Sequence, residues 1–317
     1  MTGSDRRLDL SGKRLVVIVN RKSGKRDGPS AEQVLREKLA PKVGSFDLRI
    51  IDKGRDITRT AQAAVRDGAD IVAVLGGDGT QTAVAGVLAG TDVAMAVLPT
   101  GTFNYFAREI GVGESWGEAL EALLDGELAK VSVGEVNGRV FLNNTSFGAY
   151  PEILEKRESH YKRWGRSRIG AYWAVLVAIK DLRRPMHLEV TVDGESRSYD
   201  TALAFVAKNA LQLETLGLDG GEAVRAGHFA LFVAHAQKPL ALVGAALRLA
   251  LGRVAHGRDF DMVISDEIEI APRPSRRLVA YDGEKARMRG PFHLRVRPES
   301  LLVVVPRKVG AAEGRSS

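Results

Sequence analysis

The first hundred residues alternate between short apolar runs and longer stretches in which apolar positions recur every three or four residues. Apolar runs of five or six residues bounded by Gly, Asn or Pro are typical of buried strands, and the recurrent spacing is typical of amphipathic helices. Alternating strands and helices predict a parallel sheet with crossover helices. The predicted strands are 15–19, 47–51, 71–75 and 93–98, and the predicted helices are 31–39, 58–67 and 81–88.

The pattern changes near residue 130, after which short strands follow one another with turns between them. This pattern favours an antiparallel, β-rich second domain. The predicted strands are 131–136, 140–144, 187–192, 202–207, 229–234, 268–271 and 277–281.

The strand at 71–75 runs directly into a glycine-rich turn and then into a helix. Such a turn directs backbone N–H groups outward at the positive end of a helix, and glycine lets a ligand approach the main chain closely. We interpret it as an anion-binding turn. The alternative is a purely structural strand–helix connection, since the same residues form ordinary turns. The candidate residues of this turn are Gly76, Gly77, Asp78, Gly79 and Thr80.

Two further loops follow strands of the same predicted sheet, at 20–25 and 99–104. Ligands of parallel sheets bind outside the carboxyl ends of the strands, so the three loops are expected to converge. The first loop lacks the spacing of a Walker A motif but contains phosphate-binding residue types. In the third loop, Thr102 or Asn104 can alternatively serve only to cap a helix. The candidate residues of the two loops are Asn20, Ser23, Gly24, Thr100, Gly101, Thr102 and Asn104.

Composition narrows the class of protein. The chain has 317 residues, 44% hydrophobic and 27% charged, which is typical of a globular protein with room for two domains. Its formal net charge of +7 suits anionic partners such as nucleotides, nucleic acid or lipid surfaces. The absence of cysteine excludes disulfides and thiol nucleophiles, and the six histidines show no paired metal-ligand spacing. No signal peptide is visible, and no apolar run reaches the roughly 20 residues of a membrane span.

Taken together, the motifs carry a family resemblance. The set comprises Asn-x-x-Ser-Gly at 20–24, Gly-Gly-Asp-Gly-Thr at 76–80, Leu-Pro-x-Gly-Thr-x-Asn-x-Phe-Ala-Arg at 98–108, Phe-Leu-Asn-Asn-Thr-Ser-Phe-Gly at 141–148 and Tyr-Asp-Gly-Glu at 281–284. It resembles the diacylglycerol kinase and sphingosine kinase superfamily, and more narrowly the bacterial soluble lipid kinases. The resemblance covers about residues 13–308.

The resemblance implies a fold and a division into domains. The expected architecture is a Rossmann-like, three-layer α/β nucleotide-binding domain followed by a β-sandwich. The first domain is expected over 13–135 with a returning strand at about 300–308, and the lipid-binding sandwich over 136–299. The small, polar tail 309–317 is expected to be disordered.

The resemblance also implies an activity, ATP-dependent phosphorylation of a hydroxyl on a diacylglycerol-like lipid, with ATP and Mg²⁺ as cofactors. Asp282 is the expected general base, Glu284 an orienting or metal-binding carboxylate, and Asp78 the residue that reaches the nucleotide's Mg²⁺. The same Asp-Gly-Glu tripeptide at 193–195 is expected to be an ordinary hairpin turn.

The expected partners are a nucleotide and a lipid, with no nucleic acid, and the sequence leaves the oligomeric state open. Residues 156–184 carry nine Lys or Arg against two acidic residues, with two Trp and two Tyr. This composition suits peripheral contact with an anionic membrane, although it also suits a helix packed on the sandwich. We expect a cytoplasmic protein that associates peripherally with the membrane when it acts on lipid.

Three positions depart from the family pattern. Ala83 stands where many relatives have an acidic residue, Tyr105 stands where aspartate is frequent, and Arg225 lies where bacterial members hold a structural metal. Two alternatives therefore stay open. One is an NAD kinase-like enzyme, which shares the Gly-Gly-Asp-Gly-Thr turn, and the other is a non-catalytic nucleotide- or lipid-binding relative.

Overall fold

The computed structural model describes residues 8–21, 31–148, 151, 185–235 and 259–307. The chain divides into two compact units, one of residues 1–131 and 299–317 and the other of residues 132–298. The chain passes from one unit to the other within two strands, β5 (Gly126–Val136) and β16 (Phe292–Pro306). Each unit is described here by itself.

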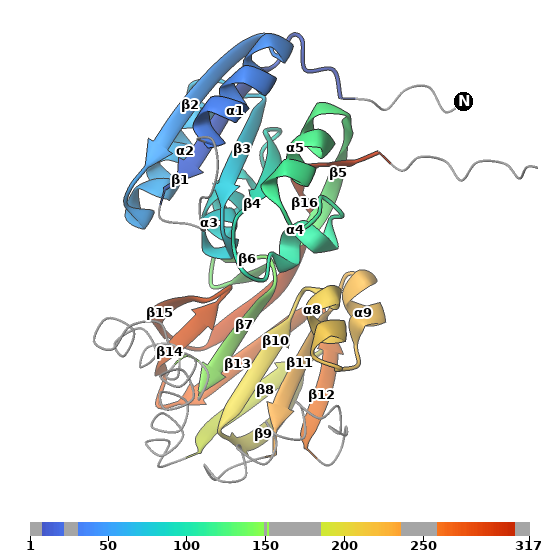
Figure 1. Cartoon of the computed structure of the whole chain (residues 1–317). Coiled ribbons are helices and arrows are strands. Elements are labelled where there is room, and N and C mark those ends of the chain that lie inside the picture. Colours follow the sequence, from blue (N-terminus) through green and yellow to red (C-terminus); the bar gives the residue numbers. More distant parts are fainter. Residues whose placement is uncertain (1–7, 22–30, 149–150, 152–184, 236–258, 308–317) are drawn as a thin grey trace, which may run out of the picture. The chain divides into compact units, whose positions relative to one another are not determined.

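Unit 1 is built on a parallel sheet in the order β2-β1-β3-β4, extended by the last part of β16. Every residue of the central strands β3 and β4 is buried, which explains why these segments read as continuous apolar runs. Helices cover the sheet (Figure 1). The strands are β1 (Arg14–Asn20), β2 (Ser45–Ile51), β3 (Ile71–Gly76) and β4 (Ala94–Pro99).

The helices of unit 1 follow the predicted spacing closely. The segment predicted at 31–39 is helix α1, and its buried residues Ala31, Leu35 and Leu39 lie four apart on one face. The helices are α1 (Ala31–Leu39), α2 (Ile57–Arg66), α3 (Asp78–Leu88), α4 (Tyr105–Glu109) and α5 (Trp116–Leu124), with 3₁₀ turns at Ala40–Lys42 and Gly54–Asp56.

Unit 2 contains two sheets of antiparallel strands. One has the order β12-β11-β10-β7-β14-β15, and the other joins the first part of β16 to β13, β8 and β9, with β5 and β6 pairing beside it. The strands are β6 (Arg139–Phe141), β7 (Asn144–Gly148), β8 (Met186–Val192), β9 (Glu195–Thr201), β10 (Leu203–Ala207), β11 (Phe229–Ala234), β12 (Phe260–Ser265), β13 (Glu267–Arg273), β14 (Arg276–Tyr281) and β15 (Glu284–Arg289).

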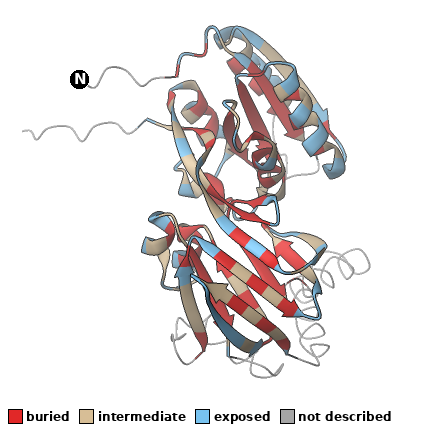
Figure 2. Cartoon of the chain, turned by 180° about the vertical axis from the view of Figure 1, so that it is seen from behind, coloured by how far each residue is buried: buried red, intermediate tan, exposed pale blue. Residues whose placement is uncertain are grey.

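The core of unit 2 lies between its two sheets. Phe147 of one sheet packs on Phe292 of the other, with ring centroids 5.0 Å apart, and Phe141 packs on Phe229 at 5.7 Å. Buried and exposed positions alternate along the strands (Figure 2), as expected for sheets with one face in a core. The opposite face of β10 and β11 is covered by two short helices, α8 (Ala210–Thr215) and α9 (Gly221–Arg225).

The predicted fold class, an α/β domain followed by a β-sandwich, is confirmed. One predicted element is wrong, because the strand expected at 140–144 is divided into β6 and β7. Between these strands, the backbone N–H groups of Leu142 and Asn143 bond to the side chain of Asp282. These two residues therefore leave the strand ladder, and the apolar pattern gave no sign of it.

Several predictions fall on residues outside the described ranges. They concern the basic segment 156–184 and the tail 309–317. Where the structure does describe the chain, every helix is too short or too polar to cross a lipid bilayer.

Candidate functional site

The Gly76–Thr80 turn of unit 1 connects the end of β3 to the first turn of α3. Gly77 is the N-cap residue, and its carbonyl accepts hydrogen bonds from the N–H groups of Thr80 and Gln81 at 2.9 and 3.1 Å. A Cβ on Gly76 would lie 2.6 Å from the Thr80 side chain, so only glycine fits there. The turn has the predicted conformation, with the amides of a helix N-terminus after a strand.

Asp78 and Gly79 are the first two residues of α3, and both are half-buried. The first four N–H groups of a helix have no partner within the helix, and they lie at its positive end. The structure therefore corrects the boundary of the predicted helix, which begins at Asp78 and not at Gln81. Gly79 accordingly belongs to the helix as well as to the turn. The group that it would offer to an anion is its backbone N–H at the helix N-terminus. Its binding role, like that of Asp78, stays a prediction.

The loop after β1 is tied to this turn by one side-chain contact. Asn20, the last residue of β1, donates from Nδ2 to Oγ1 of Thr80 at 2.9 Å. The ends of β1 and β3 therefore meet as the sequence predicts. The other two candidates of this loop, Ser23 and Gly24, lie outside the described residues.

The third loop lies against the same turn. The N–H of Thr100 donates to the carbonyl of Gly76 at 3.1 Å. A Cβ on Gly101 would lie 3.2 Å from Cα of Gly77 and 3.4 Å from Oδ2 of Asp78, which places the two loops in contact. Thr102 is exposed beside them. The structure thus brings together the described candidates of the three loops.

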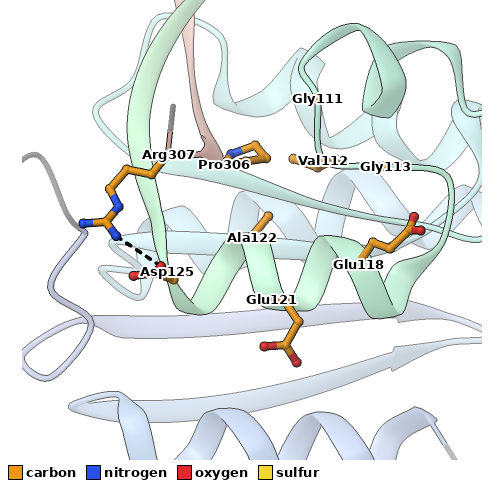
Figure 3. A pocket seen from close by; sticks show the side chains of 9 residues that line it. All are labelled: Gly111, Val112, Gly113, Glu118, Glu121, Ala122, Asp125, Pro306 and Arg307. Carbon is orange, nitrogen blue, oxygen red and sulfur yellow. Dashed lines mark hydrogen bonds and ion pairs between the residues drawn. The ribbon is translucent and has the colours of Figure 1, made fainter. Parts of the chain in front are cut away.

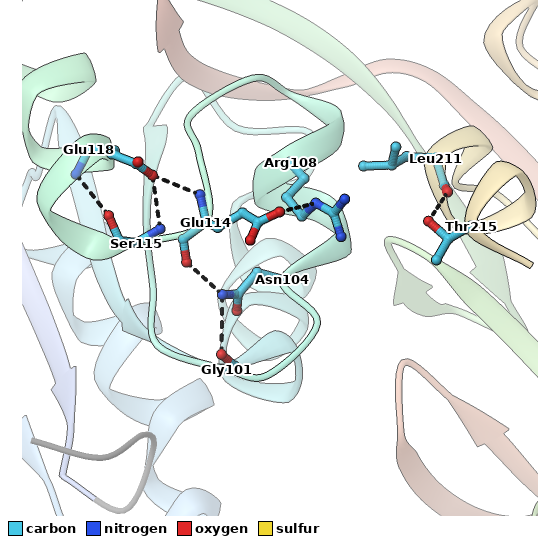
Figure 4. A network of polar contacts seen from close by, with 8 residues as sticks. All are labelled: Gly101, Asn104, Arg108, Glu114, Ser115, Glu118, Leu211 and Thr215. Atoms are coloured by element: carbon cyan, nitrogen blue, oxygen red, sulfur yellow. Dashed lines mark hydrogen bonds and ion pairs between the residues drawn. The ribbon is translucent and has the colours of Figure 1, made fainter.

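Asn104 occupies the N-cap position of α4, but its side chain makes no capping bond. Its Nδ2 donates instead to the carbonyls of Gly101, at 3.2 Å, and Glu114, at 2.9 Å (Figure 4). The interpretation of Asn104 as only a helix cap is therefore wrong, because its amide joins two loops. An ion pair of 3.0 Å between Arg108 and Glu114 joins the second of these loops to α4.

Two aromatic residues flank Asn104. Phe103 is 59% exposed and its ring stacks parallel on that of Tyr105, with centroids 5.6 Å apart. Burial raises the pKa of the Tyr105 phenol, with Arg108 lowering it and the Asp78 carboxylate raising it further. Tyr105 stands at the position where the sequence departs from the family pattern.

In unit 2, Asp282 lies in the two-residue turn between β14 and β15 and is 7% exposed. Its Oδ2 accepts a hydrogen bond from the N–H of Leu142 at 2.6 Å, and its Oδ1 accepts from Asn143 and Asn144 at 2.8 and 2.9 Å. Three backbone donors favour the ionised carboxylate and fix its orientation. Glu284, two residues later, is exposed at the start of β15.

The second Asp-Gly-Glu tripeptide forms the same kind of turn. Asp193 and Gly194 join β8 to β9 with φ of +51° and +81°, against +46° and +82° for Asp282 and Gly283. The positive φ at both central residues is that of a type I′ hairpin. The predicted hairpin at 193–195 is therefore confirmed. The two aspartates differ in their surroundings, since Asp193 is exposed and Asp282 is buried among backbone donors.

Four buried amide side chains next to Asp282 escaped the sequence reasoning, because Asn and Gln are common in turns and caps. Their only signal was a pair of adjacent asparagines inside a predicted strand. They are Asn143, Asn144, Asn209 and Gln212.

Two other features hold none of the predicted site residues. Arg225 forms an ion pair with Glu214, which ties α9 to α8.

A depression of about 540 Å³ in unit 1 is lined by residues that include Glu118, Glu121, Asp125 and Arg307 (Figure 3). Its charged side chains already have partners in unit 1, such as the 3.4 Å ion pair between Arg307 and Asp125. Among the described residues, no three His, Cys, Asp or Glu side chains are grouped so that they could hold a metal.

Comparison with known proteins concerns mainly unit 1. Residues 14–136 match the model of the diacylglycerol kinase catalytic domain. This segment is therefore similar to the diacylglycerol kinase catalytic domain family. The matched range contains the Gly76–Thr80 turn together with Asn20 and Thr100, which bond to it, and it ends at the last residue of β5.

The diacylglycerol kinases of Staphylococcus aureus strains JH9 and Newman are each 26% identical to this chain over 202 residues. That alignment covers 61% of this chain and 62% of the relative, so it spans less than two thirds of the curated relatives. A solved structure of a diacylglycerol kinase from Bacillus anthracis has a TM-score of 0.64 and 18% identity, with 94% of this chain and 98% of that chain covered. A second structure from that organism, assigned only provisionally to the same class, has a TM-score of 0.70 and 20% identity. At these identities the structural likeness concerns the fold alone.

Proposed function

We propose that this chain is an ATP-dependent kinase that phosphorylates a hydroxyl group of a diacylglycerol-like lipid. The observation that carries the proposal is the Gly76–Thr80 turn, to which Asn20 and the Thr100–Gly101 loop are bonded or packed, inside the segment that matches the diacylglycerol kinase catalytic domain. A glycine turn at a helix N-terminus suits the phosphates of a nucleotide.

The residues of unit 1 fit a nucleotide with its metal. Gly76 and Gly101 have no room for a Cβ, because the side chains of Thr80 and Asn104 fill that space and pack the loops closely together. The amide oxygen of Asn104 is buried and has no hydrogen-bond partner among the described residues, which leaves one acceptor at this site unsatisfied. When bound, Mg²⁺–ATP supplies the phosphoryl group and a divalent charge. We assign metal binding to Asp78. The residues that we assign to nucleotide binding are Asn20, Ser23, Gly24, Gly76, Gly77, Gly79, Thr80, Thr100, Gly101, Thr102 and Asn104.

We assign binding of the acceptor hydroxyl to Asp282 in unit 2, which also receives its proton as general base. The three N–H donors hold this carboxylate in a fixed orientation. Phosphoryl transfer passes through a loose transition state, in which the attacking oxygen has formed little bond and carries little positive charge. Orientation of the hydroxyl therefore matters more than basicity. We assign Glu284, at the same turn, the role of an orienting or metal-binding carboxylate.

The activity is tested with purified protein, Mg²⁺ and labelled ATP, offered either NAD or lipid alcohols in mixed micelles, diacylglycerol among them. We expect label in the lipid fraction only. Transfer to NAD alone would assign the chain to the NAD kinase-like alternative. Nucleotide binding without transfer to any acceptor would contradict the proposal and favour a non-catalytic relative. Vesicles with and without anionic lipid, tested with the whole chain, address the predicted peripheral contact through residues 156–184.

The role of Asp282 is tested by the pair Asp282→Asn and Asp193→Asn, which alter the same position of two hairpin turns of the same type. Asp282→Asn should lower kcat by about 10²- to 10⁴-fold, because general-base catalysis contributes a factor in this range. ATP binding should be nearly unchanged. Asp193→Asn should keep full activity. Loss of ATP binding in Asp282→Asn, or equal kcat in both variants, would show that the base is assigned wrongly.

A further inference from the structure

The four buried amides of unit 2 form two pairs. Asn209, 1% exposed, donates from Nδ2 to Oδ1 of Asn143 at 2.9 Å, and Asn144 donates from Nδ2 to Oε1 of Gln212 at 3.0 Å. Asn144 is the first residue of β7 and Asn143 directly precedes it, while Asn209 is the N-cap of α8 and Gln212 lies in its first turn. Each pair thus joins β7 to α8.

The same two asparagines hold Asp282 through their backbone. The N–H groups of Asn143 and Asn144 both donate to Oδ1 of Asp282, and the N–H of Asp282 donates to the carbonyl of Asn144 at 3.0 Å. The carbonyl of Asn143 accepts from the N–H of Lys208, next to Asn209, at 2.8 Å. A continuous chain of hydrogen bonds therefore runs from α8 through the start of β7 to the Asp282 carboxylate.

We propose that Asn209 and Gln212 are positioning residues that set the location of the Asp282 carboxylate through the side chains of Asn143 and Asn144. The inference rests on the proposed function of Asp282 as the group that binds the acceptor hydroxyl. Asn209 and Gln212 act on the backbone donors of Asp282 and touch no reactant in this scheme.

The comparison with Asp193 explains why the network is more than support for a turn. The Asp193 hairpin has the same backbone conformation and carries an exposed aspartate, so the turn forms without such a network. Buried amides stabilise a fold little, because their hydrogen bonds mainly offset the cost of removing them from water. What a fully bonded network adds is a fixed geometry, and a displacement of about 1 Å near the reacting atoms can lower a rate about 10²-fold.

The decisive variant is Asn209→Asp. Asn137→Asp, at an exposed position, is the control for the loss of an amide donor. Asn209→Asp keeps the oxygen that accepts the N–H of Gln212 at 2.8 Å and so keeps the cap of α8, but it loses the donor to Asn143. Asn137→Asp likewise keeps an oxygen that accepts the N–H of His293 and loses a donor, here to the carbonyl of Pro291. Both are substitutions of equal size in unit 2, and only the first touches the network.

The first readout is kinetic. We expect Asn209→Asp to lower kcat about 10- to 100-fold with KM for ATP changed less than about twofold, and Asn137→Asp to leave both unchanged. In an Asp282→Asn background, or in Asp282→Glu if the first has no residual activity, Asn209→Asp should have little further effect, because it acts through Asp282. Full multiplication of the two losses would overturn the proposal, as would equal kcat in the two Asn→Asp variants.

The second readout does not depend on kinase activity. Hydrogen exchange at the N–H groups of residues 142–144 should become at least about 10-fold faster in Asn209→Asp and stay unchanged in Asn137→Asp. Unchanged exchange in both variants would overturn the inference even if the enzyme is a lipid kinase. A third outcome is faster exchange in Asn209→Asp with no phosphoryl transfer by the unsubstituted protein. It would contradict the proposed function, and the network would then have no role in catalysis.

Discussion

At the residue scale, the first turn of α5 shows how neighbouring donors set the properties of a single carboxylate. Glu118 accepts hydrogen bonds on Oε2 from the N–H groups of Ser115 and Glu114, at 3.2 and 3.0 Å, while its own N–H donates to Oγ of Ser115 at 3.3 Å. This is a capping box, in which two residues satisfy each other's free backbone donors. The bonds from the backbone of Ser115 and Glu114, with that from the Ser115 hydroxyl, lower the pKa of Glu118.

The first prediction concerns the pH dependence of this capping box. Because the pKa of Glu118 is lower in the folded than in the unfolded chain, its contribution to stability is present above the unfolded pKa and is lost as pH falls through the folded pKa. Glu118→Gln should therefore be less stable than the unsubstituted protein at pH 7, and the difference should shrink below about pH 4.5. Denaturant unfolding across this range measures it. A pH-independent difference would contradict the assignment, and a double-mutant cycle with Ser115→Ala gives the coupling.

At the element scale, a turn and the side chain it carries obey different rules. The two Asp-Gly hairpins share one backbone conformation, which follows from the tendency of Asp and Gly to adopt positive φ. The strand β7 and helix α8, which give Asp282 its donors and their supports, come from distant parts of the chain. The local sequence therefore fixes the conformation of the turn, while β7 and α8 fix the burial and orientation of the aspartate side chain.

A second prediction separates these two contributions. A Cβ at Gly194 or Gly283 would meet no atom within 4 Å, and φ is +81° and +82°. Gly194→Ala and Gly283→Ala should therefore lose similar stability, about 1–2 kcal/mol each from the left-handed conformation alone. Chemical denaturation of both variants tests this. A loss several times larger for Gly283→Ala would mean that the Asp282 turn is strained by its contacts and is not the equivalent of the Asp193 turn.

At the scale of the whole molecule, unit 1 depends on the end of the chain. The last part of β16 pairs in parallel with β4, where Val303 lies opposite Met95, and β5 pairs with β16. Leu301 and Val303 are fully buried, and the N–H of Gly90 donates to the carbonyl of Ser300. Without these residues, β4 would be left as an exposed edge and part of the core would face water.

The third prediction follows from this strand. A fragment of residues 1–131 should fail to fold cooperatively, whereas the same fragment joined by a flexible linker to residues 299–307 should fold and bind Mg²⁺–ATP. Thermal unfolding with and without the nucleotide distinguishes the two, since a ligand at 100 times its Kd stabilises by about 2.7 kcal/mol. Cooperative folding of 1–131 alone would show that the returning strand is dispensable. In a matched control, joining the scrambled sequence of 299–307 should not rescue the fragment.

The sequence by itself determined the elements and the turns. Periodicity located α1 and the buried strands because helix and strand repeats are local properties, and Asp-Gly and Gly-Gly-Asp-Gly fixed turn conformations that depend on neighbouring residues only. Motif spacing also identified Asn20 and the Thr100–Gly101 loop, which lie against the Gly76–Thr80 turn. Only the tertiary structure decided in which of the two Asp-Gly-Glu turns the aspartate side chain is buried. It also decided that residues 142–143 leave the strand ladder and that Asn209 bonds to Asn143. Those outcomes depend on hydrogen bonds between residues 66 to 140 positions apart, and no local pattern encodes them.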